Sequence, residues 1–157
     1  MKFAARVARM EIFGLPLHPL VVHFPVVAIP TLAILGLVMA VAPGFRKRYG
    51  VAALILGVVT TVVTFFAATT GNSLNEDLGF SDDFIGLHRR RGDLLRLFVL
   101  GLTLSLGAMF GVSRREASSR MDPLTVLTSV LVVAFAVLST LWTVLTGHSG
   151  ADAVWGF

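Results

Sequence analysis

The sequence predicts an all-α membrane protein, a bundle of four transmembrane helices that run alternately up and down. Hydrophobic residues make up 55% of the 157 residues and charged residues only 14%, where soluble domains carry about 25%. Four apolar segments reach the length of about 20 residues that a bilayer crossing needs. These predicted spans are residues 19–42, 51–70, 94–112 and 123–146, and they leave room for one domain over 1–157.

Residues 1–13 have the pattern of an amphipathic helix that lies in the membrane interface. An unstructured basic leader is the alternative interpretation. Basic residues recur on one face and apolar residues on another: Lys2, Arg6 and Arg9 against Phe3, Val7, Met10 and Phe13.

The first predicted span begins at Pro19, a residue suited to a first helical turn, so His18 lies near its start. Pro25 and Pro30 fall inside this span, where each removes a backbone hydrogen bond and should kink the helix. The second span follows a basic turn, residues 46–48, and is expected to end near Thr70. We expect residues 72–80 to form a polar loop.

The third helix should begin before the membrane, because Ser81 is a plausible N-cap with two aspartates directly after it. The fourth opens with Asp122 and Pro123, an N-cap followed by proline at the first helical position. Gly147 is expected to end it, immediately before His148. No repeat of 20–50 residues is apparent.

With four spans, both termini lie on one side of the membrane. We call this the histidine side, because it also carries residues 71–93 and all four histidines; the other, the turn side, carries the short turns after Pro43 and Val112. Seven Lys and Arg fall on the histidine side and six on the turn side. The six are packed into short turns with few acids, so we expect the turn side to be cytoplasmic and the histidines to face outward. We attribute the net charge of +4 to the basic residues that set the membrane topology. We therefore expect no nucleic-acid binding.

The four histidines are the candidate ligands, since each lies near an expected helix end: His18, His23, His88 and His148. The chain has no cysteine, which excludes thiolate metal sites, iron–sulfur clusters and thioether-linked haem. Bis-histidine haem b needs one ligand from each of two helices, and the first and third helices of such a bundle are diagonal. We therefore expect His23 with His88 as the first pair and His18 with His148 as the second.

Three arginines follow His88, and Arg91 is the candidate partner of an anionic group such as a haem propionate or a lipid phosphate. A snorkelling basic collar with local ion pairs is the alternative interpretation of these arginines. Zinc or copper is the alternative cofactor, which would require three or four imidazoles to converge. A cofactor-free structural or interaction subunit is the third hypothesis, with the histidines as interfacial hydrogen-bonding groups. Whether the protein is an enzyme stays open. Electron transfer or binding is favoured over hydrolysis, because no serine–histidine–acid arrangement stands out.

Three stretches carry a family resemblance: GLPLHPLVVHFP from Gly14, TGNSLNEDLGFSDDFIGLH from Thr70, and the final TGHSG. The chain resembles the bacterial membrane proteins catalogued as domain of unknown function 2231. The resemblance implies a multi-pass protein of the bacterial inner membrane with the four histidines as its functional set. It also implies a redox setting with redox partner proteins, and it leaves oligomerisation open. Asn72 and Asn75 stand where the family often has acids, which puts an acidic site there in doubt.

Overall fold

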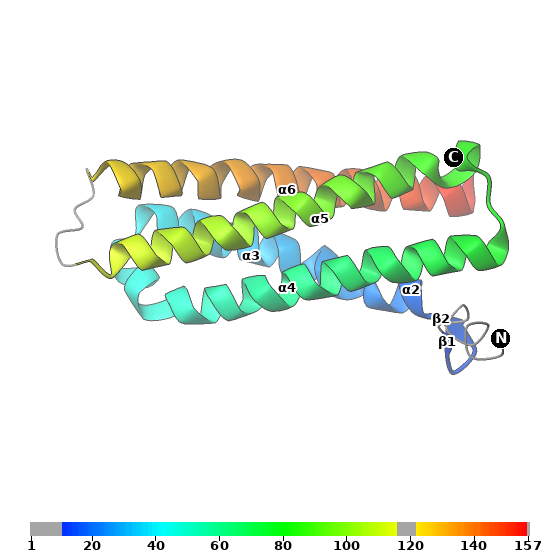
Figure 1. Ribbon diagram of the computed structural model, residues 1–157, viewed down its shortest axis with the longest axis horizontal. Coiled ribbons are helices and arrows are strands. Elements are labelled where there is room, and N and C mark those ends of the chain that lie inside the picture. The colour runs from blue at the N-terminus through cyan, green and yellow to red at the C-terminus, as the bar shows by residue number, and fades with distance from the viewer. Residues whose placement is uncertain (1–10, 116–121, 157) are drawn as a thin grey trace.

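The protein is all-α, as the sequence predicts, and its computed structural model describes residues 11–115 and 122–156. Four long helical segments cross the length of the bundle (Figure 1), and all four are long and apolar enough to cross a membrane. In chain order the helices are α2 (Leu17–Val21), α3 (His23–Val41), α4 (Pro43–Leu78), α5 (Asp82–Ser113) and α6 (Pro123–Trp155).

A two-stranded hairpin precedes the helices. Strand β1 (Glu11–Ile12) pairs antiparallel with β2 (Leu15–Pro16), and the turn between them has positive φ angles at Phe13 and Gly14. The expected interfacial helix over residues 1–13 is therefore wrong for its last three residues. Residues 1–10 lie outside the described part of the chain.

The first span consists of two helices, because α2 ends at Val21 and α3 begins at His23. Pro25 has no N–H with which to bond the carbonyl of Val21, and the helix changes direction most easily where that bond is missing. The neighbouring bonds survive, since Val22 N–H donates to His18 and Val26 N–H donates to Val22. Val22 at the break keeps helical backbone angles, so α2 and α3 together form one candidate span, Leu17–Val41.

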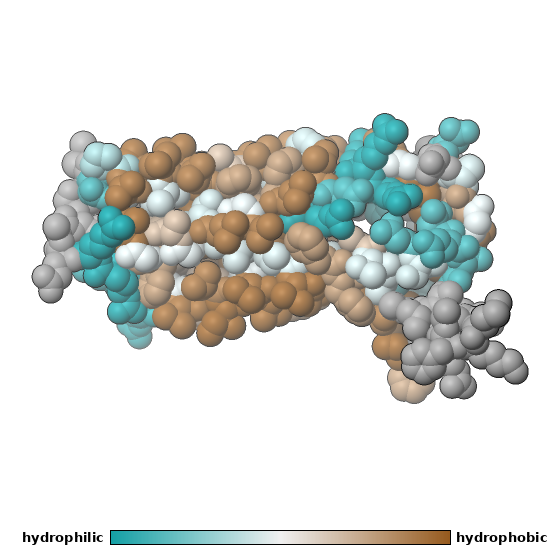
Figure 2. Space-filling view, in the orientation of Figure 1, coloured by the Kyte–Doolittle hydropathy of each residue, from teal (hydrophilic) through white to brown (hydrophobic). Residues whose placement is uncertain are grey.

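The other helices extend well beyond the predicted spans. Helix α4 has 36 residues, about 54 Å at 1.5 Å per residue, against about 30 Å of hydrocarbon. The expected polar loop over residues 72–80 is wrong, because α4 continues to Leu78, and α6 runs past Gly147 to Trp155. Both helices end at a left-handed glycine, Gly79 and Gly156, the usual helix C-terminus. Figure 2 shows hydrophobic residues over the middle of the bundle and hydrophilic residues at its ends.

The predicted starts of α5 and α6 are confirmed. The predicted start of the first span at Pro19 is wrong, because α2 begins at Leu17, and the expected basic turn over residues 46–48 lies inside α4. Ser81 is the N-cap of α5, although its side chain makes no capping hydrogen bond. Asp122 is the N-cap of α6, and its carboxylate accepts from the backbone N–H of Thr125 at 3.1 Å. Proline at the first helical position fixes the backbone angle there in advance.

Each helix of the bundle packs on two neighbours. Helix α5 contacts α4 and α6, α3 contacts the same two, and α3 and α5 are diagonal. The centre of the core is apolar, with Leu32, Met39, Leu102 and Val132 fully or almost fully buried.

The bundle contains an internal repeat of two helical hairpins. Buried positions of α3 recur in α5 70 residues later, and buried positions of α4 recur in α6 79 residues later. The α3 and α5 pairs include Ile29 and Val99, Leu32 and Leu102, and Met39 and Met109; the α4 and α6 pairs include Thr60 and Ser139, and Thr64 and Thr143. Because α3 and α5 begin on the same side, the hairpins cross the membrane in the same sense, related by an approximate two-fold axis along the bundle. This period exceeds the 20–50 residues considered from the sequence.

The two seams between the hairpins differ. On the α4–α5 seam the hydroxyls of Thr61 and Thr103 are 2.9 Å apart, and Thr103 also donates to the carbonyl of Gly57 at 3.0 Å. On the α3–α6 seam Ala33 stands at the position related to Thr103 and cannot bond to Thr140. An apolar groove of about 500 Å³ opens there instead.

Candidate functional site

His18 projects from the short helix α2 onto α4. Its Nδ1 lies 2.9 Å from the backbone carbonyl oxygen of Ala67 and 3.4 Å from the hydroxyl of Thr70. The Thr70 hydroxyl donates to that same carbonyl at 2.9 Å. The imidazole rests on Gly71, where a Cβ would come within 3.0 Å of Cε1. Glycine at this position therefore lets the ring approach the helix backbone.

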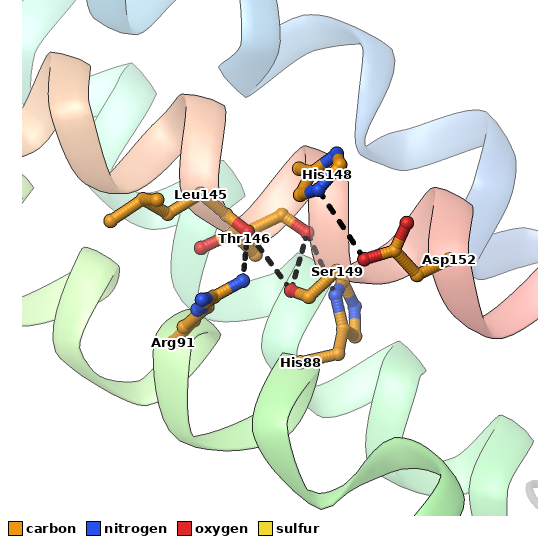
Figure 3. A network of polar contacts seen from close by, with 7 residues as sticks. All are labelled: His88, Arg91, Leu145, Thr146, His148, Ser149 and Asp152. Carbon is orange, nitrogen blue, oxygen red and sulfur yellow. Dashed lines mark hydrogen bonds and ion pairs between the residues drawn. The ribbon is translucent and has the colours of Figure 1, made fainter. Parts of the chain in front are cut away.

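His88 projects from α5 onto α6 in the same way, as Figure 3 shows. Its Nδ1 is 3.0 Å from the carbonyl oxygen of Thr146, which also accepts from the hydroxyl of Ser149 at 3.1 Å. The ring rests on Gly150, where a Cβ would again come within 3.0 Å of Cε1. A histidine, a backbone carbonyl, a hydroxyl three residues later and a glycine four residues later thus form one unit that occurs twice.

The repeat relates these two units. His18 and His88 are 70 residues apart in the sequence. The residues that seat them are 79 residues apart: Ala67 and Thr146, Thr70 and Ser149, and Gly71 and Gly150. The two imidazoles meet between the hairpins with ring centroids 6.2 Å apart and ring planes at 83°. Each hairpin therefore contributes one imidazole to a shared pair on the histidine side of the bundle.

The hydrogen bonds determine the tautomer of both imidazoles. A backbone carbonyl only accepts, so Nδ1 carries the proton in each ring. In a neutral imidazole Nε2 then has the free lone pair. A histidine that binds a metal is usually oriented in this way, with its other N–H donated to a carbonyl or carboxylate. His18 and His88 are thus held in fixed orientations, each with the lone pair of Nε2 unused by the bond to the carbonyl.

Arg91 lies one turn after His88 and bonds to the same stretch of α6. Its Nη1 donates to the carbonyl oxygen of Leu145 at 2.9 Å, and the Ser149 hydroxyl donates to that oxygen at 3.0 Å (Figure 3). This bond uses one of the five donor hydrogens of the guanidinium. The guanidinium makes no other hydrogen bond in the part of the chain that the structure describes.

The other two histidines do not join the pair. His23 is exposed, and its Nδ1 lies 2.6 Å from the carbonyl oxygen of Pro19 within its own helical turn. His148 is also exposed and lies inside α6, with Nε2 3.5 Å from the carboxylate of Asp152. The ring contact therefore differs from the pairs expected from the sequence, which joined His23 to His88 and His18 to His148.

Convergence of three or four ligands, as a zinc or copper site would require, is not observed. Over residues 11–115 and 122–156, which include all four histidines, no group of three His, Asp or Glu residues could hold a metal ion. The sequence reasoning also missed the two glycines and two carbonyls that seat the imidazoles. The signal for these positions is the recurrence of a hydroxyl residue followed by glycine, Thr70-Gly71 and then Ser149-Gly150, 79 residues later in the sequence.

A sequence model of a protein family, described as "Predicted membrane protein (DUF2231)", matches residues 14–157. The match includes both histidine units and all four long helical segments. No curated protein matches the chain. No solved structure matches it either.

Proposed function

We propose that this chain, which belongs to the DUF2231 family of predicted membrane proteins, is a membrane haem protein. Its four apolar helices are in contact with the lipid bilayer. His18 and His88 would hold one b-type haem in this proposal. The observation that carries it is the pair of imidazoles 6.2 Å apart, each with Nδ1 bound to a backbone carbonyl.

The number of ligands favours haem over a free metal ion. Haem iron in a bis-histidine site takes two ligands from the protein, which His18 and His88 would supply. Structural zinc sites use four protein ligands and catalytic zinc sites three. Within the described residues only His18 and His88 come together, which is the count that bis-histidine haem needs.

The ring separation of 6.2 Å would allow both imidazoles to bind one metal. A metal–nitrogen bond of about 2 Å, added to roughly 1 Å from that nitrogen to the ring centre, gives centroids about 6 Å apart. The carbonyls of Ala67 and Thr146 hold both rings, and Gly71 and Gly150 leave space for them beside the helices. His18 and His88 would bind through Nε2.

Arg91 is proposed to bind a propionate. Its guanidinium is tied to Leu145 by Nη1, which positions the remaining donors one turn from His88. Arginine binds carboxylates through two parallel hydrogen bonds. This role would orient the group at the polar end of the bundle.

When bound, the haem iron would supply one-electron redox chemistry, so we propose electron transfer with a redox partner protein. The polar ends of α4, α5 and α6 beyond the apolar belt (Figure 2) would offer the contact surface. We place the histidine side outside the cytoplasm, in the bacterial inner membrane, because basic residues are concentrated in the short turns of the other side.

An absorption spectrum of the detergent-purified protein, oxidised and then reduced with dithionite, tests the proposal. We expect a Soret band that shifts on reduction and is lost in both His18→Ala and His88→Ala. His23→Ala and His148→Ala are the matched controls and should keep the band. A featureless spectrum from protein expressed with haem precursor would refute haem binding. Metal analysis of that sample would then separate zinc or copper binding from a cofactor-free subunit.

A further inference from the structure

Arg46 is a buried charge at the end of the bundle opposite the histidines. It lies in the first turns of α4 and is 4% exposed, whereas the adjacent Lys47 and Arg48 are exposed. Its Nε and Nη1 are buried and have no hydrogen-bond partner among the described residues. Burial of a guanidinium is strongly unfavourable when no acceptor replaces its hydrogen bonds to water. An acceptor is therefore needed at this position.

The related hairpin has an acid where α4 has none. Helix α6 begins with the N-cap Asp122, whose carboxylate bonds to Thr125, the residue 79 positions after Arg46. The N-cap of α4 is Ala42, which offers no side-chain acceptor. A helix N-terminus favours negative charge, and here it carries a cation. Both features indicate that an anion from outside the described residues binds at the start of α4.

A second arginine borders the same position. The ring of Phe110 packs directly on Gly50, one turn after Arg46 on α4. Arg114, one turn after Phe110 on α5, has its guanidinium carbon 4.7 Å from the centre of that ring. Arg114 therefore lies at the same turn-side end of the α4–α5 seam as Arg46.

The surroundings are those of a lipid headgroup site. The end of the bundle near Arg46 is hydrophilic, next to the apolar belt (Figure 2). Tyr49 lies there beneath Arg48, 5.4 Å from the guanidinium carbon to the ring centre, and tyrosine is typical of the membrane interface. Farther along α4, Val51 and Ile55 are 51% and 60% exposed and offer an apolar surface for acyl chains.

We propose that Arg46, with Arg114, binds the phosphate group of an anionic phospholipid at the turn side of the membrane. Basic pockets between membrane helices bind such headgroups, and arginine donates in parallel to phosphate oxygens. The phosphate supplies the acceptors that Arg46 lacks and the negative charge that the start of α4 lacks. Free inorganic phosphate has the same binding chemistry, but it would not use the adjoining apolar surface.

Binding of fluorescent phosphatidylglycerol to the full chain in neutral detergent tests this proposal. Arg46→Gln should weaken binding by about tenfold or more, since it removes charge-assisted bonds. Arg48→Gln removes the same charge two residues away at an exposed position and should weaken binding by at most about threefold. Arg114→Gln should fall between them. Equal effects of Arg46→Gln and Arg48→Gln would overturn the proposal.

Thermal unfolding supplies a readout that does not depend on the labelled lipid. Phosphatidylglycerol should raise the melting temperature of the wild type, and Arg46→Met should lose that rise while staying folded in lipid-free detergent. Stabilisation by sodium phosphate alone, at equal concentration, would identify free phosphate as the ligand and overturn the lipid assignment.

Discussion

Gly71→Ala tests how closely the histidine ring must approach α4. The added Cβ would lie 3.0 Å from Cε1 and 3.1 Å from Nδ1 of His18, where carbon atoms favour about 3.5–4.0 Å. The ring must therefore recede by roughly half an ångström. That movement would lengthen the 2.9 Å bond from Nδ1 to the Ala67 carbonyl to about 3.4 Å, beyond the ordinary range for N–H···O bonds.

The expected cost follows from these distances. Losing the hydrogen bond costs about 0.5–1.5 kcal/mol, and crowding adds about 1 kcal/mol or more. Replacing glycine by alanine inside a helix returns about 0.5–1 kcal/mol. Gly71→Ala should therefore be less stable than the wild type by about 1 kcal/mol. Gly147→Ala has no heavy atom within 4 Å of the new Cβ and should be more stable than the wild type.

The assay is unfolding in mixed micelles of mild detergent and dodecyl sulfate, followed by circular dichroism. A double-mutant cycle isolates the ring, because in a His18→Ala background Gly71→Ala should become stabilising. If Gly71→Ala stabilises the otherwise unchanged protein as much as Gly147→Ala does, the imidazole does not rest on this glycine and the reasoning fails.

Three further predictions concern the repeat and its seams. Gly150→Ala should displace His88 and destabilise the protein as Gly71→Ala does, again by about 1 kcal/mol; a stable variant in the same unfolding assay would contradict the equivalence of the two units. Thr103→Val should cost about 1 kcal/mol, since it removes two interhelical hydrogen bonds; Thr140→Val, whose hydroxyl bonds to nothing in the described part of the chain, should be close to neutral, and equal losses would contradict the seam difference. Asp122→Ala should lower the free energy of unfolding by about 1 kcal/mol, because the N-cap hydrogen bond is lost. Asp122→Asn should retain most of the wild-type stability, because asparagine also caps helices. An unchanged unfolding midpoint for Asp122→Ala would contradict this capping role.

The sequence predicted the helices better than their ends. Ser81 and Asp122 begin helices as expected, because capping is a local property of a few residues. The ends of α4 and α6 were placed where the apolar runs stop, yet polar residues continue a helix beyond the bilayer. Gly79 and Gly156, both left-handed, were the better stop signals.

The site could be predicted in part. Residue chemistry singled out His18 and His88 together with His23 and His148, but pairing depends on the packing of helices far apart in the chain. The contact follows from the repeat, which pairs stretches such as Gly57–Gly71 and Ala136–Gly150 at a separation of 79. The buried position of Arg46 could not be seen from the sequence, since neighbouring Lys47 and Arg48 have the same character and are exposed.

The position of each histidine bond has a consequence for assembly. His18 bonds within the first hairpin and His88 within the second, so neither imidazole depends on the opposite hairpin for its hydrogen bond. Each hairpin can therefore enter the bilayer during synthesis with its own imidazole already oriented. The ring pair is then created in a single docking step, and the first hairpin must remain in the membrane with its inner face unpaired until the second has been translated.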